Sequence, residues 1–169
     1  TGLYLSFDNG TTWTRERAGR HTIVTLDWRG PRYLSDGFVV SRHDRGWEQG
    51  VPLMTAQPGA TLKVVAVSPA DGSLWVSGNF GLDASFDGGL TWVSRREGLP
   101  TIGGAFPRTA SPDAVAFDGS GDVVYLGLDD GLYVGRTRGV GWRRLTDDVA
   151  AILGGPLDVN CVLVAGETL

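Results

Sequence analysis

The chain of 169 residues has one cysteine, one lysine and two histidines, and it has no long apolar run. The single cysteine, Cys161, excludes an internal disulfide and a thiolate metal site built from this chain alone. No apolar segment approaches the roughly 20 residues that a membrane-spanning helix needs, so no membrane span is expected. The net charge of -4, with arginines scattered along the sequence, gives no support to nucleic-acid binding.

The signatures of common catalytic sites are absent as well. The sequence contains no G-x-S-x-G, H-E-x-x-H, P-loop or dinucleotide-binding pattern. His21 and His43 lie near charged residues in expected turns, which favours solvated loop histidines over a catalytic base. A glycosidase needs two carboxyl groups about 5 to 9.5 Å apart, and the 19 acidic residues offer many pairs without distinguishing one. Binding is therefore the stronger hypothesis, with catalysis as the alternative.

Glycine is abundant, at 26 residues, and an eight-residue phrase occurs twice. SFDNGTTW covers residues 6–13 and SFDGGLTW covers residues 85–92. Two weaker copies also end in tryptophan: SRHDRGW at residues 41–47 and GRTRGVGW at residues 135–142. The four tryptophans are 34, 45 and 50 residues apart, and such spacing is typical of β-propeller blades, which repeat every 40 to 50 residues or so. These tryptophans are Trp13, Trp47, Trp92 and Trp142.

Short β-branched or aromatic runs bounded by turn residues fill each repeat, and no segment has helical periodicity. The chain is therefore expected to be all-β, a β-propeller of four-stranded antiparallel blades. Three complete blades are predicted at residues 22–55, 62–98 and 113–148. A fourth is split, with its inner two strands in residues 151–167 and its outer two in residues 2–19. NCVLVAG near the C-terminus should then pair with GLYLSF near the N-terminus, which would close the ring and remove exposed sheet edges.

The repeated phrase resembles the Asp-box, or BNR repeat, of β-propellers such as sialidases, sortilin-type ectodomains and photosystem II assembly factors. The resemblance implies a structural turn between the third and fourth strands of a blade, away from the ligand face, and it transfers no catalytic residue. It also favours a secreted or extracytoplasmic location, although the residues themselves leave the compartment open. The full matches are Ser6, Asp8, Gly10, Thr12 and Trp13, and Ser85, Asp87, Gly89, Thr91 and Trp92; the weaker copies keep Ser41, Asp44, Gly46 and Trp47, and Gly139 and Trp142.

The chemistry of the phrase agrees with a structural turn. A short aspartate accepts hydrogen bonds from backbone N–H groups a few residues on, and glycine supplies a positive φ. The tryptophan is expected to lie between neighbouring sheets, where its large ring fills the gap. As an alternative, Asp8 and Asp87 would bind calcium, but the later acidic ligands of a calcium loop are missing. No cofactor is therefore expected, with a structural or ligand-bridging cation such as calcium as the alternative.

The turns between the second and third strands of each blade, and the connections from one blade to the next, should gather at one mouth of the central channel, opposite the Asp-box turns. The turns between second and third strands fall at residues 35–37, 79–81 and 129–131 and at the junction that begins at Glu167. A ring of carboxylates there would attract a metal ion or a basic ligand group. Asp-Gly is also the preferred pair for a two-residue hairpin, so turn chemistry is the simpler explanation. The candidate central-face residues are Asp36, Asn79, Asp129, Asp130 and Glu167.

Two assemblies fit residues 1–169 as a single propeller domain. The chain closes on itself as a four-bladed ring, or it belongs to a larger ring, as a fragment or as a homodimer in which each copy completes the other's split blade. The expected function is non-catalytic binding or scaffolding, with a protein or carbohydrate ligand at the central face. A sialidase-like or other glycoside hydrolase, or a fragment of one, is the alternative.

Overall fold

The computed structural model describes residues 2–19, 23–26, 30–44, 50–103, 108–136, 138–147 and 157–164. Within these residues the chain forms β-strands and no helix, which confirms the all-β prediction. The strands are β1 (Gly2–Leu5), β2 (Thr14–Ala18), β3 (Ile23–Leu26), β4 (Arg32–Ser35), β5 (Val39–His43), β6 (Val51–Thr55), β7 (Leu62–Val67), β8 (Leu74–Gly78), β9 (Gly81–Ser85), β10 (Val93–Ser94), β11 (Thr101–Ile102), β12 (Arg108–Thr109), β13 (Ala114–Phe117), β14 (Val124–Leu128), β15 (Gly131–Arg136) and β16 (Val140–Arg144).

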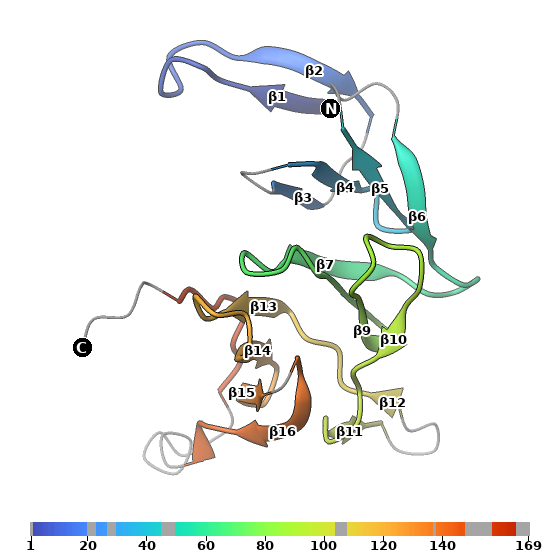
Figure 1. Ribbon diagram of the computed structural model, residues 1–169, viewed down its shortest axis with the longest axis vertical. Helices are drawn as coiled ribbons and strands as arrows, with labels where there is room; N and C mark the ends of the chain where they lie inside the picture. Colours follow the sequence, from blue (N-terminus) through green and yellow to red (C-terminus); the bar gives the residue numbers. More distant parts are fainter. Residues whose placement is uncertain are drawn as a thin grey trace.

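Three four-stranded antiparallel sheets contain most of these strands, each with its strands in chain order (Figure 1). We call them sheet I (β3 to β6), sheet II (β7 to β10) and sheet III (β13 to β16). They fall within the three ranges that the sequence predicts for complete blades. Two hairpins lie outside them: β1–β2 precedes sheet I, and β11–β12 connects sheets II and III. The second hairpin has no counterpart in the predicted blades.

The three sheets pack face to face, and the first strand of each sheet lies close to the first strand of the next sheet. β7 contacts both β3 and β13, the first strands of the neighbouring sheets. Every residue of β8 is buried because alternate side chains enter two different cores. Leu74 and Val76 pack towards sheet I, and Trp75 packs towards sheet III. The core between sheets I and II contains Tyr33, Val40, Leu62, Val65, Leu74 and Val76; the core between sheets II and III includes Trp75, Leu126, Leu128, Tyr133 and Trp142.

The predicted closure of the ring is wrong for the described residues. β1 pairs only with β2, and residues 157–164 form no strand. The C-terminal segment instead lies against sheet III, where the Val159 N–H donates to the Leu128 carbonyl at 3.0 Å. Figure 1 shows the hairpin β1–β2 and the C-terminal segment at separate places in the fold. The apolar pattern of this segment is that of a strand, but a strand requires a partner edge, and β1 lies elsewhere.

His43 also differs from its prediction. It lies on β5 with its side chain fully buried, and its Nε2 is 3.0 Å from the Ser41 hydroxyl. A Cβ added at Gly50 would come within 2.5 Å of the ring, so this backbone packs directly over the imidazole. His43 is therefore a core residue, neither a solvated loop histidine nor a base that a ligand can reach. His21 lies outside the described residues.

Candidate functional site

The two full copies of the repeated phrase form closed hydrogen-bonded turns. In the second copy, between β9 and β10, the Ser85 hydroxyl donates to Asp87 at 2.8 Å and accepts the Gly89 N–H at 2.8 Å. The Thr91 N–H and hydroxyl donate to the two oxygens of Asp87 at 2.9 and 2.5 Å. These bonds, led by the Thr91 hydroxyl, lower the pKa of Asp87 to about 2. Both carboxylate oxygens of Asp87 thus accept hydrogen bonds within the turn.

The first copy, between β1 and β2, has the same hydrogen bonds on Asp8. The Thr12 N–H and hydroxyl donate to Asp8 at 2.8 and 2.7 Å, and the Ser6 hydroxyl donates at 2.9 Å. Hydrogen bonds from Thr12 lower the pKa of Asp8 below its ordinary value. The glycine of each copy has a positive φ, +87° at Gly10 and +96° at Gly89, as the turn requires.

The tryptophans of the copies differ in burial. Trp92 is partly buried, and its Nε1 donates across to the Leu53 carbonyl of sheet I at 3.4 Å. Trp142 is buried, and its Nε1 donates to the Arg95 carbonyl of sheet II at 2.8 Å. Both therefore lie between sheets, as expected. Trp13 does not, because 62% of its surface is exposed and its Nε1 donates to Gly10 in its own turn.

The weaker copies keep only parts of the turn. Ser41 donates to the Leu34 carbonyl at 3.3 Å, and Asp44 forms an ion pair with Arg42, so neither reproduces the Asp87 turn. Gly139 has a φ of +75° and lies directly against Trp75. Gly46 and Trp47 lie outside the described residues.

Two of the predicted central-face residues have side chains that hydrogen-bond to the backbone. Asp36 accepts the N–H groups of Phe38 and Val39, both at 2.9 Å. The Asn79 side chain accepts the Thr61 N–H at 3.0 Å and donates to the Gly59 carbonyl at 2.9 Å. The hydrogen bonds of Asp36 lie within its own turn and agree with turn chemistry, whereas those of Asn79 tie its turn to the loop before β7.

Asp130 also has partners inside the protein. It accepts the Tyr133 hydroxyl at 2.8 Å, and Arg144 lies 3.9 Å away. Burial of Tyr133, together with the Asp130 carboxylate, raises the pKa of the phenol to about 12. Glu167 lies outside the described residues.

Asp129 is the exception, because it faces a cluster of charges from three parts of the chain. The turn that carries Asp129 joins β14 to β15, at the end of the sheets opposite the β9–β10 turn that contains Asp87. Lys63 of β7 donates to Asp113, just before β13, at 2.8 Å, and so links sheets II and III. Asp113 hydrogen-bonds with Asp129, and Asp158 of the C-terminal segment adds its charge. We call these four residues the carboxylate cluster.

The cluster holds more negative than positive charge. The four residues carry three carboxyl groups and one ammonium, and the pKa of Asp129 is raised, first by its hydrogen bond with Asp113 and then by burial and the Asp113 charge. The group therefore retains its proton to higher pH than an isolated aspartate, since that proton joins two carboxyls. No group of three or more potential metal ligands is placed to hold a metal ion in the part of the chain that the structure describes. The arrangement is suited to a basic group of a ligand.

The sequence prediction included Asp129 and missed Lys63, Asp113 and Asp158. Lys63 and Asp113 occupy matching places. Lys63 lies at the start of β7, the first strand of sheet II, and Asp113 lies just before β13, the first strand of sheet III. The prediction placed the connections between blades at this mouth as well, but it took its candidate residues only from the turns between second and third strands. Aligning the starts of the first strands, LKVV and DAVA, would have placed both charged residues at the same mouth.

Comparisons with known proteins agree with a propeller-type fold. No protein-family model matches the sequence, and no curated protein matches it either. One solved structure, the extracellular domain of a protein described as the one-component system BT4673 of B. thetaiotaomicron, matches 95% of the chain at 18% identity and a TM-score of 0.64. A second structure of a BT4673 extracellular domain, described as a hybrid two-component system, matches 85% of the chain at 20% identity and a TM-score of 0.57. The chain spans only 22% and 20% of these two structures.

A Niastella koreensis GH74 enzyme matches 95% of the chain at 17% identity, and the chain covers 30% of it. Its TM-score of 0.42 is too low to bear on the fold. The two higher-scoring matches show that the stacked antiparallel sheets of this chain follow the arrangement of propeller-type domains. In the described residues, no helix is long and apolar enough to cross a membrane.

Proposed function

We propose that this chain is a non-catalytic ligand-recognition part of an Asp-box β-propeller and that it binds a basic group of a protein ligand at the carboxylate cluster. The observation that carries the proposal is the placement of Asp113 and Asp158 beside Asp129, with Lys63 paired to Asp113 as the one cation of the cluster. An arginine or lysine of a ligand would replace the proton that joins Asp113 and Asp129. Arginine fits best, because its planar guanidinium donates two parallel hydrogen bonds to a carboxylate.

A peptide-binding experiment tests this proposal. The probe is a short fluorescein-labelled peptide with two arginines, and the control is the same peptide with citrulline, which keeps the shape and removes the charge. We expect the arginine peptide to bind and the citrulline peptide to bind at least tenfold more weakly. Asp129→Asn should weaken binding of the arginine peptide about tenfold, which corresponds to roughly 1.4 kcal/mol.

The matched control is Asp122→Asn, since Asp122 is an exposed residue of the β13–β14 turn, at the far end of the sheet. That variant should bind like the parent. Fluorescence anisotropy at two salt concentrations gives the affinities, and the affinity should fall as salt rises. Equal binding of the two peptides, or equal losses in Asp129→Asn and Asp122→Asn, would contradict the proposal.

A glycoside hydrolase is the second candidate, and the cluster gives it less support. Asp113 and Asp129 would supply the proton donor and the proton acceptor that a glycosidase needs. The two carboxyls are joined directly by a hydrogen bond, however, so they are too close together for a sugar to lie between them. Retaining glycosidases hold their two carboxyls about 5 Å apart and inverting ones hold them further apart, so that the sugar fits between. A panel of fluorogenic glycosides separates the candidates. Turnover that Asp129→Asn abolishes would favour the hydrolase over the binding module.

We also propose that the described sheets belong to a larger ring. Trp75 and Tyr125 occupy equivalent register positions on the second strands of sheets II and III, and Tyr33 of sheet I packs in the core against sheet II. The next sheet buries Tyr33 and Trp75 to 4% and 1% exposure, whereas Tyr125 is only partly buried. A further blade would cover that face of sheet III. It would come from a longer protein that contains these residues or from a second copy in a homodimer. Sedimentation of the 169-residue chain distinguishes a monomer from a dimer.

Location outside the cytoplasm is part of the same proposal. It is supported by the description of both BT4673 matches as extracellular domains. A protease-protection experiment on intact cells that express the full-length protein would test it, and protection of the domain until lysis would contradict it.

A further inference from the structure

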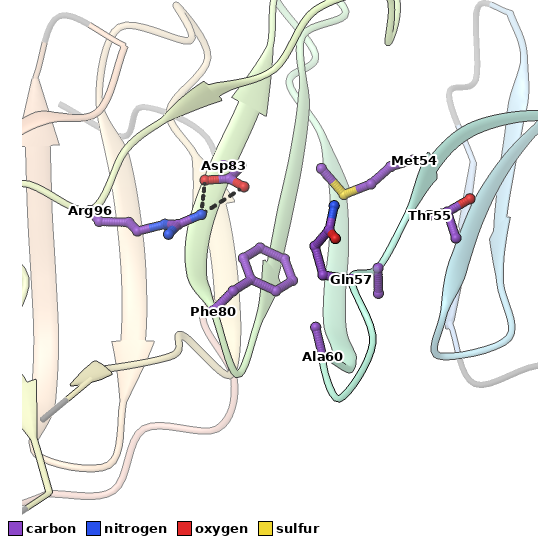
Figure 2. A pocket seen from close by; sticks show the side chains of 8 residues that line it. Met54, Thr55, Gln57, Ala60, Phe80, Asp83 and Arg96 are labelled. Atoms are coloured by element: carbon purple, nitrogen blue, oxygen red, sulfur yellow. Dashed lines mark hydrogen bonds and ion pairs between the residues drawn. The ribbon is translucent and has the colours of Figure 1, made fainter. Parts of the chain in front are cut away.

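A cavity of about 290 Å³ lies between sheets I and II, and no residue of the carboxylate cluster lines it. One wall comes from the end of β6 and the loop after it, with Met54, Thr55 and Gln57. The opposite wall comes from sheet II, with Phe80 in the β8–β9 turn and Asp83 on β9 (Figure 2). The cavity therefore opens at the same end of the sheets as the carboxylate cluster, towards their outer strands. Arg96, just after β10, completes the sheet II wall.

The charged groups of this cavity neutralise each other. Arg96 Nη2 donates to both oxygens of Asp83, at 2.7 and 2.9 Å (Figure 2). The same guanidinium lies 5.5 Å from the centre of the Phe80 ring. Gly81, with a φ of +107°, makes room for this side chain, because a Cβ there would lie 3.0 Å from Arg96. The Arg96–Asp83 pair is thus held in place by the Phe80 ring and by the Gly81 backbone. The wall of the cavity that it forms has no net charge.

The other wall offers neutral hydrogen-bonding groups. Gln57 and Thr55 are exposed, and neither side chain has a hydrogen-bond partner in the part of the chain that the structure describes. The backbone carbonyl of Gln57 accepts the Ala60 N–H at 2.8 Å, which fixes the loop that presents its amide. In Figure 2, the Phe80 ring lies between Arg96 and the loop with Gln57 and Ala60. The cavity thus combines an aromatic wall, an amide, a hydroxyl and a compensated carboxylate.

We propose that this cavity binds an uncharged, hydroxyl-bearing ring of monosaccharide size, a pyranose. The volume lies at the lower limit of small-molecule sites, so the ligand is small. A charged ligand would lose hydration without meeting a net opposite charge, which disfavours it. A pyranose has an apolar face of C–H groups that fits against Phe80 and a rim of hydroxyls. Those hydroxyls match the Gln57 amide, the Thr55 hydroxyl and the lone pairs of Asp83 that Arg96 leaves unused.

Saturation-transfer NMR on the 169-residue chain tests the proposal. The neutral probes are the methyl glycosides of glucose, galactose and mannose; the charged probes are glucuronic acid, glucosamine and the zwitterion leucine. At least one neutral glycoside should bind with a Kd of about 1 mM, and each charged probe should bind at least fivefold more weakly. Gln57→Ala should weaken the neutral glycoside about fivefold, and Phe80→Leu should weaken it beyond detection.

Three controls keep the outcome interpretable. Gln57 is exposed and its side chain is unpaired in the described structure, so Gln57→Ala should melt at the parent temperature and carries the test even if Phe80→Leu fails to fold. Arg143→Gln changes an exposed residue of a different cavity, on sheet III, and should leave glycoside binding unchanged. Asp129→Asn should also leave it unchanged, so loss of this site and loss of the carboxylate cluster are separate results.

The proposal is overturned if no neutral glycoside binds at 50 mM or so, about 50 times the expected Kd. It is equally overturned if leucine or a charged sugar binds more tightly than every neutral glycoside, since the ligand class would then be wrong. Unchanged binding in Gln57→Ala, with a neutral glycoside bound, would place the sugar elsewhere.

Discussion

The Trp92 indole donates its N–H to the Leu53 carbonyl at 3.4 Å and so joins sheet II to sheet I. This contact predicts a stability difference between two tryptophans of the same motif. Trp92→Ala removes a partly buried ring from the core between the sheets and should cost about 2 kcal/mol, below the value for a fully buried tryptophan. Urea unfolding followed by circular dichroism measures this change.

Trp13→Ala is the matched control, because Trp13 ends the other full copy of the motif. Its ring is 62% exposed and its N–H bonds within its own turn, so the expected cost is below about 0.5 kcal/mol. Equal losses in the two variants would mean that Trp13 is covered in solution by another blade.

The difference between these tryptophans shows what the sequence alone reveals. The local turn depends on hydrogen bonds between residues two to four positions apart, so Ser, Asp, Gly and Thr in both copies predict it correctly. Burial of the tryptophan depends on whether another sheet lies beside it, and no residue of the motif reports that. For the same reason the three complete sheets were predictable from strand patterns, whereas pairing between the chain ends was not.

Gly139 and Gly141 provide a second matched pair. Both have a positive φ, +75° and +67°, so alanine is strained at either position. A Cβ at Gly139 would lie 2.5 Å from the buried Trp75 ring, whereas a Cβ at Gly141 meets no atom within 4 Å. Gly139→Ala should therefore cost about 3 kcal/mol, from strain and overpacking, and Gly141→Ala about 1 kcal/mol.

Urea unfolding of the two glycine variants, beside the parent, gives both values. The tryptophan fluorescence of the protein should change in Gly139→Ala alone, since only that substitution places a Cβ against the Trp75 and Trp142 rings. If Gly139→Ala is as stable as Gly141→Ala, the close packing between Trp75 and the turn is not present in solution.

Tyr133 predicts a loss of stability at alkaline pH. Its pKa is raised to about 12 in the folded protein, against 10.0 ordinarily, by burial and by the Asp130 carboxylate. Between these pH values the folded state holds a proton that the unfolded state has lost, so stability falls as pH rises from 10 to 12. Tyr133→Phe should remove this part of the pH dependence and should cost about 1 kcal/mol at pH 7, where it deletes the bond to Asp130.

Thermal melts of parent and Tyr133→Phe across this range test the prediction. The two melting temperatures should converge above pH 10, because only the parent loses stability through Tyr133. Melting curves that stay a constant distance apart would show that Tyr133 ionises in the folded protein as it does in the unfolded chain.

The carboxylate cluster shows why a functional site is harder to predict than a strand. Asp129 was visible as part of an Asp-Gly turn, a local signal. Lys63, Asp113 and Asp158 meet it only because separate sheets and the C-terminal segment converge at one mouth. Such convergence depends on how the sheets stack, and the sequence spacing of these residues, from 16 to 50 positions between neighbours, carries no trace of it.

Asp87 predicts a loss of stability at acid pH, in contrast to the alkaline loss predicted for Tyr133. Its pKa is about 2 in the folded protein, against 3.8 ordinarily, chiefly because the Thr91 hydroxyl donates to it. Between these values the unfolded state binds more protons, so stability rises with pH there. The contribution of Asp87 to stability is complete above about pH 4 and is lost as pH falls towards 2.

Thr91→Val keeps the charge of Asp87 and removes the hydroxyl that is the main cause of its low pKa. It should therefore lower the melting temperature at pH 7 and narrow the pH range over which Asp87 changes the stability. The melting temperatures of parent and Thr91→Val, measured from pH 7 to 2, should therefore approach each other as the carboxylate is protonated. If the difference between them is the same at pH 2 as at pH 7, the ionised Asp87 does not hold the turn together.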